Sequence, residues 1–279
     1  MRRTGTVLLA IAALLTSSAL AHATSITYEG TRVGVSTTTP PGVDLGYHYD
    51  ATATFTVSGN NLIVTLTNTA TDDVLNPIEV LTGIFFHISD PVTLSKVSAQ
   101  IPGGSSVLFA PVGGSGPAVG GEWAYKIGLN NYSLDRGISS SGMGIFGPSD
   151  RFPGNNLQGP ADPDGLQYGI TAAGDNPATG NAPVKGSNAL IKNSVVFTLA
   201  MDPNVAKLFD PSHEITGVVF QYGTALDEGH TVGECISGCL PPPPPPEVPE
   251  PGTIFFLSGA LAALITVTLR WRETARQRA

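Results

Sequence analysis

Ala51-Thr52-Ala53-Thr54-Phe55-Thr56-Val57 is followed by Ser58-Gly59-Asn60-Asn61 and then by Leu62-Ile63-Val64-Thr65-Leu66-Thr67-Asn68. Both flanks alternate threonine with small or apolar residues, which is the period of a strand with one buried face. Glycine and asparagine in the centre adopt the turn conformations that other residues resist. The stretch therefore predicts a β-hairpin, the clearest one in the chain.

Further strands are expected on both sides of this hairpin. The stretches with strand-like composition are residues 79–89, 92–99, 107–110, 121–129, 193–201 and 215–223. We expect the first two of these to pair with each other, and residues 204–209 to form a single helical turn. Residues 130–188 are rich in turn-forming residues and predict irregular structure packed on the sheet, punctuated by short strands. The expected fold class is all-β, a single β-sandwich-like ectodomain with long loops.

Composition favours the same fold class. The chain of 279 residues contains 33 glycines and 23 prolines, and only 13% of its residues are charged. Helical proteins are richer in Glu, Lys, Ala and Leu, whereas many short strands joined by turns need glycine and proline.

The N-terminus has the three parts of a secretory signal peptide. Arg2 and Arg3 form a charged start, residues 7–15 an apolar core, and Ala21-His22-Ala23 a small-x-small cleavage site. Cleavage would leave a mature chain that begins near Thr24. An uncleaved membrane helix is the alternative, and the shortness of the apolar core disfavours it.

The C-terminus combines a rigid linker with a short apolar run. Residues 241–246 are six consecutive prolines, which favour an extended polyproline II spacer. This predominantly apolar run, sixteen residues from 254 to 269, would span about 24 Å as a helix, less than a bilayer core of about 30 Å. Arginines follow at positions 270, 272, 276 and 278, and they predict a cytoplasmic C-terminus.

Val248-Pro249-Glu250-Pro251, the apolar run and the arginine-rich end together resemble the PEP-CTERM sorting signal. This resemblance implies a surface protein of a Gram-negative bacterium whose motif Pro249, Glu250 and Pro251 is recognised by exosortase, an integral-membrane cysteine peptidase. Such proteins commonly accompany exopolysaccharide production. The alternative is an ordinary C-terminal anchor behind a proline-rich linker.

The predicted organisation has five parts. They are a signal peptide (1–23), the ectodomain (24–239), the linker with its motif (240–251), a transmembrane sorting helix (252–270) and an arginine-rich cytoplasmic tail (271–279). Export would pass through an inner-membrane intermediate and end at the cell surface or in the extracellular matrix. Segments 54–59, 121–126, 164–170 and 220–224 also resemble one group of exosortase-sorted ectodomains, a resemblance that implies no activity.

Charge narrows the range of partners. Eight lysines and arginines face twenty-one acidic residues between Thr24 and Pro251. Such an acidic surface argues against nucleic acid and anionic lipid as partners, while it permits calcium binding without requiring it.

Cys235 and Cys239 are the two cysteines, separated by Ile-Ser-Gly. Outside the cytoplasm a local disulfide is the expected state, and Ser237-Gly238 supplies the flexible turn that so small a ring needs. A redox pair and a thiol linkage to another molecule remain as alternatives.

Motifs of catalysis and metal binding are weak in this chain. Residues 142–147 match the letters of a dinucleotide fingerprint but lack the flanking strand and helix that this motif requires. The histidines His48, His87, His213 and His230 lack metal-ligand spacing, and no Gly-x-Ser-x-Gly occurs. Asp162-Pro-Asp164-Gly165 is first a turn sequence, and Asp227-Glu228 is expected in a solvated loop. We therefore expect no catalytic residue, no metal and no cofactor.

Aromatic residues offer the remaining candidate site. Trp123, Tyr47 and Tyr49 could stack on sugar rings, although Trp123 and Tyr125 have the spacing of one core face of a sandwich. The predicted function is a structural or adhesive role without catalysis, in or near extracellular polysaccharide. A carbohydrate-binding module is the main alternative, and a secreted glycosidase is a weaker one.

Overall fold

The computed structural model describes residues 25–35, 44–110, 116–141, 155–159, 163, 165–240 and Arg270. The chain divides into two compact units, residues 1–240 and 241–279, and the fold described here is that of the first. Within the described part of the chain, no helix is long and apolar enough to cross a membrane. The predicted signal peptide (1–23), the motif at 249–251 and the apolar run at 254–269 lie outside the described residues.

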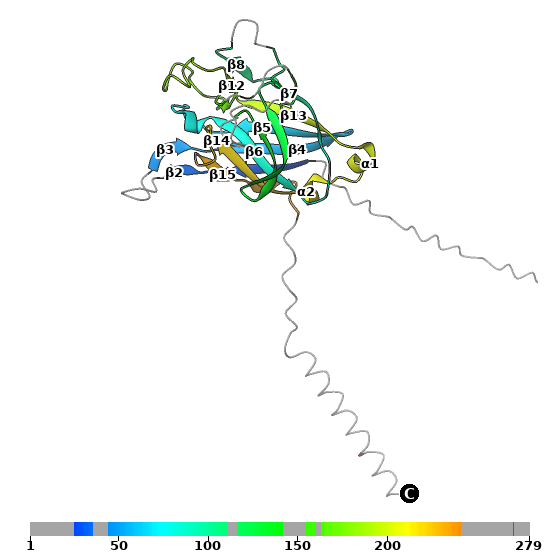
Figure 1. Cartoon of the computed structure of the whole chain (residues 1–279). Helices are drawn as coiled ribbons and strands as arrows, with labels where there is room; N and C mark the ends of the chain where they lie inside the picture. Colours follow the sequence, from blue (N-terminus) through cyan, green and yellow to red (C-terminus); the bar gives the residue numbers. More distant parts are fainter. Residues whose placement is uncertain are drawn as a thin grey trace, which may run out of the picture. The chain divides into compact units, whose positions relative to one another are not determined.

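Two large sheets make up most of the domain, and β2 (Val33–Val35) and β3 (Asp44–His48) form a small third sheet (Figure 1). The first has six antiparallel strands in the order β16 (Glu234–Ser237), β1 (Ser25–Gly30), β4 (Ala51–Ser58), β5 (Asn61–Asn68), β13 (Ser194–Ala200) and β7 (Ser95–Gln100). The hairpin prediction is confirmed, since β4 and β5 pair along their whole length from Ala51↔Asn68 to Ser58↔Asn61. Gly59, in the turn between them, has a φ of +58°, which glycine adopts without strain.

The second sheet is mixed and branched around β6. Its main path is β15 (His230–Val232), β14 (Ile215–Tyr222), β6 (Leu81–Ile88), β11 (Ile170–Thr171), β12 (Leu190–Lys192) and β8 (Ser106–Leu108). β10 (Leu134–Ser139) also pairs with β6, and β9 (Ala124–Asn131) pairs with β10. The smaller elements are β2 (Val33–Val35), β3 (Asp44–His48), η1 (Pro77–Glu79), α1 (Pro203–Ala206) and α2 (Pro211–Glu214).

Aromatic side chains from both sheets meet in the core. Phe55 of β4 lies 5.2 Å from Phe86 of β6 between ring centroids, and Trp123 lies 4.9 Å from Phe197 of β13. All four side chains are fully buried. Burying such large apolar surfaces is the main stabilising contribution to folding. The result is a mostly β, sandwich-like fold, as the sequence predicts.

β6 lies in the interior of the second sheet, and both of its faces are covered by other side chains. Residues 81–86 are all buried, and Phe85 packs into a second cluster with Ala124, Leu134 and Val219. The predicted pairing of β6 with β7 is wrong, since β6 belongs to the second sheet and β7 pairs with β13 in the first. β14 pairs along one edge of β6, and β10 and β11 pair along the other, so neither edge is left for β7.

The expected loop region after residue 130 also contains a strand. β10 forms a hairpin with β9 whose turn residues Tyr132 and Ser133 have φ values of 55° and 62°. Glycine or asparagine usually marks such turns, and neither residue occupies positions 132 and 133, so no motif predicted this hairpin. The expected helical turn at 204–209 is confirmed in part by α1, and β13 and β14 match their predicted strands.

Tyr132 provides a pH-dependent test of this hairpin. Burial, helped by the negative charge of Asp227, raises the pKa of Tyr132 to about 12. Its hydroxyl lies within hydrogen-bond distance of the Gln221 side chain and 3.1 Å from the Leu226 carbonyl oxygen. The folded state therefore holds the phenolic proton more tightly than the unfolded state does. The free energy of unfolding should fall as pH rises from about 10 to about 12.

The matching variant is Tyr132→Phe, which keeps the ring and removes the titrating group. We expect it to lower stability at pH 7 by about 1 kcal/mol, through the lost hydrogen bond, and to flatten the decline above pH 10. Urea unfolding of the full chain in mild detergent, at pH 7, 9, 10.5 and 11, measures both effects. Parallel pH profiles for the two proteins would show that Tyr132 does not titrate in this range.

Candidate functional site

The first and last strands of the domain are neighbours. β1 and β16 pair antiparallel, with Thr27 opposite Ser237 and Tyr28 opposite Cys235. Gly238, at a φ of +72°, packs so closely on Ser25 that a Cβ at this position would collide with the Ser25 carbonyl oxygen. The chain therefore enters the fold at Ser25 beside the point where it leaves after β16.

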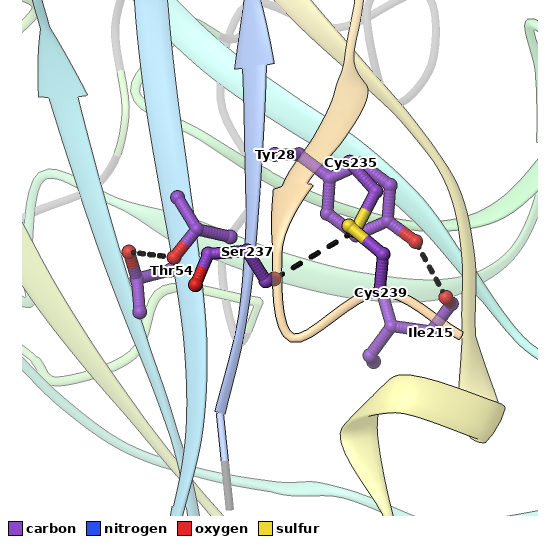
Figure 2. The surroundings of a disulfide bond; sticks show 7 residues. Tyr28, Thr54, Ile215, Cys235, Ser237 and Cys239 are labelled. Atoms are coloured by element: carbon purple, nitrogen blue, oxygen red, sulfur yellow. Dashed lines mark hydrogen bonds between the residues drawn. A yellow bond between two sulfur atoms is a disulfide. The ribbon is translucent and has the colours of Figure 1, made fainter. Parts of the chain in front are cut away.

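A disulfide closes the chain at this exit. Cys235 and Cys239 are bonded, with their Cα atoms 5.9 Å apart, so the predicted disulfide is present. Figure 2 shows it beside the ring of Tyr28, whose hydroxyl donates a hydrogen bond of 2.7 Å to the Ile215 carbonyl oxygen of β14. The bond fixes the turn after β16 to the strand itself, on the edge of the first sheet.

The predicted sugar-stacking residues do not form an exposed platform. Trp123 is 0% exposed and Tyr49 is 5% exposed, and Tyr47 is half-buried against the core cluster. Tyr49 instead contacts the buried ring of Tyr222, with centroids 4.9 Å apart. A stacking side chain must offer one face to solvent, so the proposed roles of Trp123 and Tyr49 are wrong. The core interpretation holds for Trp123 and Tyr125.

Buried carboxylates in the described residues hold loops. Burial raises the pKa of Glu79 and of Asp175. Glu79 accepts backbone hydrogen bonds of 3.0 and 2.8 Å from Leu75 and Asn76, and Asp175 accepts one of 3.0 Å from Val74. Both side chains thereby satisfy donors of one loop, residues 74–76.

The other predicted polar residues are also dispersed. His87 contacts Asp135 at 2.8 Å, His213 contacts Asp210 at 3.0 Å and His48 contacts Asp72 at 3.5 Å. The described residues contain no group of three or more side chains that could hold a metal ion. Asp162 and Asp164 lie outside the described residues.

One expectation about the acidic loops needs correction. Asp227 is exposed as expected, but the carboxylate of Glu228 accepts hydrogen bonds from the backbone of Thr224 and of Ala225, the latter at 3.2 Å. The turn after β14 directs these N–H groups at one carboxylate, so Glu228 stabilises the loop.

A groove that the sequence did not indicate lies between the edges of the two sheets. Its volume is about 580 Å³, within the range of about 300 to 1,000 Å³ typical of ligand sites. β7 pairs only with β13, and β9 only with β10, among the described strands. The lining comes from both strands and one loop: Leu94, Ser95, Lys96, Tyr125, Lys126, Ile127 and Asn155.

A buried arginine lies behind one wall of this groove. Arg136 is 5% exposed, and its Nη1 donates a long hydrogen bond of 3.4 Å to the hydroxyl of Tyr125. Its Nε lies 3.5 Å from the Asp135 carboxylate and makes no hydrogen bond within the described structure. An arginine stays charged in proteins, so a weakly paired positive charge lies next to a groove-lining residue.

No protein-family model, no curated protein and no solved structure matches the chain. What remains as evidence for function is the set of sequence signals at both ends, the disulfide at the exit and the groove between the sheet edges. The residues of that groove come from three segments, 94–96, 125–127 and 155, so no single motif could have marked it.

Proposed function

We propose that the protein is an exported, exosortase-processed component of the cell surface or of the extracellular polysaccharide matrix. Its role is structural or adhesive and involves no catalysis. In this proposal, residues 24–239 are the functional domain, and Pro249, Glu250 and Pro251 are the motif that exosortase recognises. The C-terminal apolar segment anchors the chain in the membrane until it is processed.

The disulfide is the observation that carries the proposal. Disulfides form and persist outside the cytoplasm and are rare inside it, where thiol reductants keep cysteines reduced. The Cys235–Cys239 bond joins the only two cysteines of the chain. A domain that uses both of its cysteines in this way suits an oxidising compartment, as export requires.

The neighbouring ends of the domain supply a second, independent argument. The signal peptide would precede Ser25 and the linker follows Leu240, and both lead from the edge formed by β1 and β16. Because both ends of the domain lie at the same place, it can fold while its N- and C-terminal extensions are both attached to one membrane. This arrangement suits a chain that stays attached to the membrane through both signals until each one is cleaved.

The oxidation state of the cysteines in cells tests export. Cells that make the protein would be quenched with acid, and free thiols would be alkylated before mass analysis. We expect Cys235 and Cys239 to remain unmodified and joined, two hydrogens lighter than free thiols.

A variant without residues 2–23 is the matched control, because it keeps the domain and removes only the export signal. Both of its cysteines should be alkylated. Finding both cysteines alkylated in the intact protein as well would overturn the proposal.

A further inference from the structure

We propose that the groove between β7 and β9 binds carboxylate-bearing polysaccharide, such as chains that contain uronic acid. The inference rests on the proposed function, since it names the ligand class that a matrix protein would hold. In this proposal the polysaccharide binds in a groove with cationic side chains between the sheet edges, and does not bind to Trp123 and Tyr49.

Charge is the first argument. The proposed mature chain carries eight cationic and twenty-one acidic residues, yet the described residues that line the groove include Lys96 and Lys126 and no carboxylate. Arg136 adds a buried positive charge behind Tyr125. Two of the eight cations therefore line the groove of an otherwise acidic protein, and a third, Arg136, lies behind it with the Asp135 carboxylate 3.5 Å from its Nε. Such a concentration of one sign raises the local concentration of the opposite charge and steers it to the site.

The neutral groups of the lining favour a sugar. Ser95, Tyr125 and Asn155 present hydroxyl and amide groups, which can donate to and accept from sugar hydroxyls. Ile127 is 50% exposed on β9 and offers apolar surface for the C–H face of a ring. Convergent polar groups fix the orientation of a ligand in such sites, and the apolar side chains provide contact area.

A peptide that adds to the sheet edges fits this groove less well. At one end of β9, Tyr125 donates a backbone hydrogen bond of 2.9 Å to Asn155, and Trp123 accepts one of 2.8 Å from Leu157. At the far end of β7, residues 117–119 occupy the edge in the same way, with bonds of 2.8 and 2.9 Å to Ile101 and Ala99. Peptides that bind by strand addition need a continuous row of free backbone groups. The native chain already fills part of both rows.

Binding of polygalacturonate to the full chain in mild detergent tests the proposal. Titration calorimetry at low salt should detect binding that weakens as ionic strength rises. Methyl-esterified polygalacturonate has the same backbone without the charge and should bind at least tenfold more weakly. Equal binding of the two polymers would overturn the proposal, because the ligand would not be recognised through its carboxylates.

The variants separate the groove from the overall charge. The double substitution Lys96→Gln and Lys126→Gln should weaken polygalacturonate binding about tenfold. Lys185→Gln and Lys207→Gln remove the same number of charges from exposed positions outside the groove lining, and should change binding less than twofold. Equal losses in the two double variants would place the binding elsewhere and refute the groove.

Two further outcomes count against the inference. Poly-glutamate that binds as tightly as polygalacturonate, and competes with it, would assign the groove to acidic peptides. Failure of both polymers to bind would reject the groove as a carboxylate site. Neither result touches the export proposal, because the oxidation state of Cys235 and Cys239 in cells is measured without any glycan.

Discussion

Replacing Trp123 with alanine is expected to destabilise the ectodomain by about 3 to 5 kcal/mol. The side chain is 0% exposed and its ring centroid lies 4.9 Å from that of Phe197, on the other sheet. Truncation would remove a large apolar contact between the layers and leave a cavity that neighbouring strands can fill only in part. Urea unfolding of the full chain in mild detergent, followed by circular dichroism, measures the difference.

Tyr47→Ala is the informative comparison, because Tyr47 was predicted with Trp123 as a stacking residue and is half-buried. It should cost less than Trp123→Ala, about 1 to 2 kcal/mol, in line with its smaller buried surface. Trp123→Phe keeps part of the ring contact and should fall between the two. A Trp123→Ala protein that unfolds within 1 kcal/mol of the wild type would contradict the core role.

The same variants address the earlier interpretation of Trp123 as a sugar platform. A core residue affects binding only through stability, so a conservative Trp123→Phe protein should bind polygalacturonate as the wild type does. Loss of binding in a fully folded Trp123→Phe protein would return this residue to the ligand site.

The local sequence pattern was sufficient to predict the elements whose partners are near in sequence. Residues 51–57 and 62–68 mostly alternate threonine with small or apolar residues, flank a Gly-Asn turn and pair with each other, and β13 and β14 were recognisable from their apolar runs. Cys235 and Cys239 were also predictable as a disulfide, since only three residues separate them and two of these, Ser237 and Gly238, form a flexible pair.

The pairing of strands that are distant in sequence could not be predicted from local patterns. β6 and β7 follow each other in the chain but belong to different sheets, a choice made by the burial of β6 on both faces. The position of Trp123 in the sequence is compatible with an exposed sugar-stacking role and with a core role. Only its contact with Phe197 in the structure distinguishes the two roles. The groove depends on two strand edges that meet in space, and neither edge carries a motif.

Changing Pro249, Glu250 and Pro251 to alanine is expected to abolish C-terminal processing. Each proline fixes φ near −65° and removes a backbone N–H, so the pair disfavours a helix at the motif. Alanine has the highest helix propensity, so in the variant a helix formed by the predicted apolar segment could extend through the cleavage region. A membrane peptidase would then meet a hydrogen-bonded helix and would lack the glutamate and prolines by which the motif is read.

Intact mass and cell fractionation measure the result. The wild-type chain should lack the residues after the motif, whereas the triple variant should keep all residues through Ala279 and remain in the membrane fraction. Pro242→Ala, Pro243→Ala and Pro244→Ala together make the matched control, because they change the same number of linker residues and spare the motif.

The control also distinguishes recognition of the motif from an effect of the length and stiffness of the linker. In a polyproline II conformation the six prolines would extend about 20 Å, and three alanines would let this linker bend without changing Pro249 or Glu250. If processing depends on the motif, the control is cleaved and released while the triple variant is not. If both variants are retained alike, the stiffness of the linker is the determinant. Normal release of the triple variant would mean that the C-terminal segment is an ordinary anchor and that the sorting proposal is wrong.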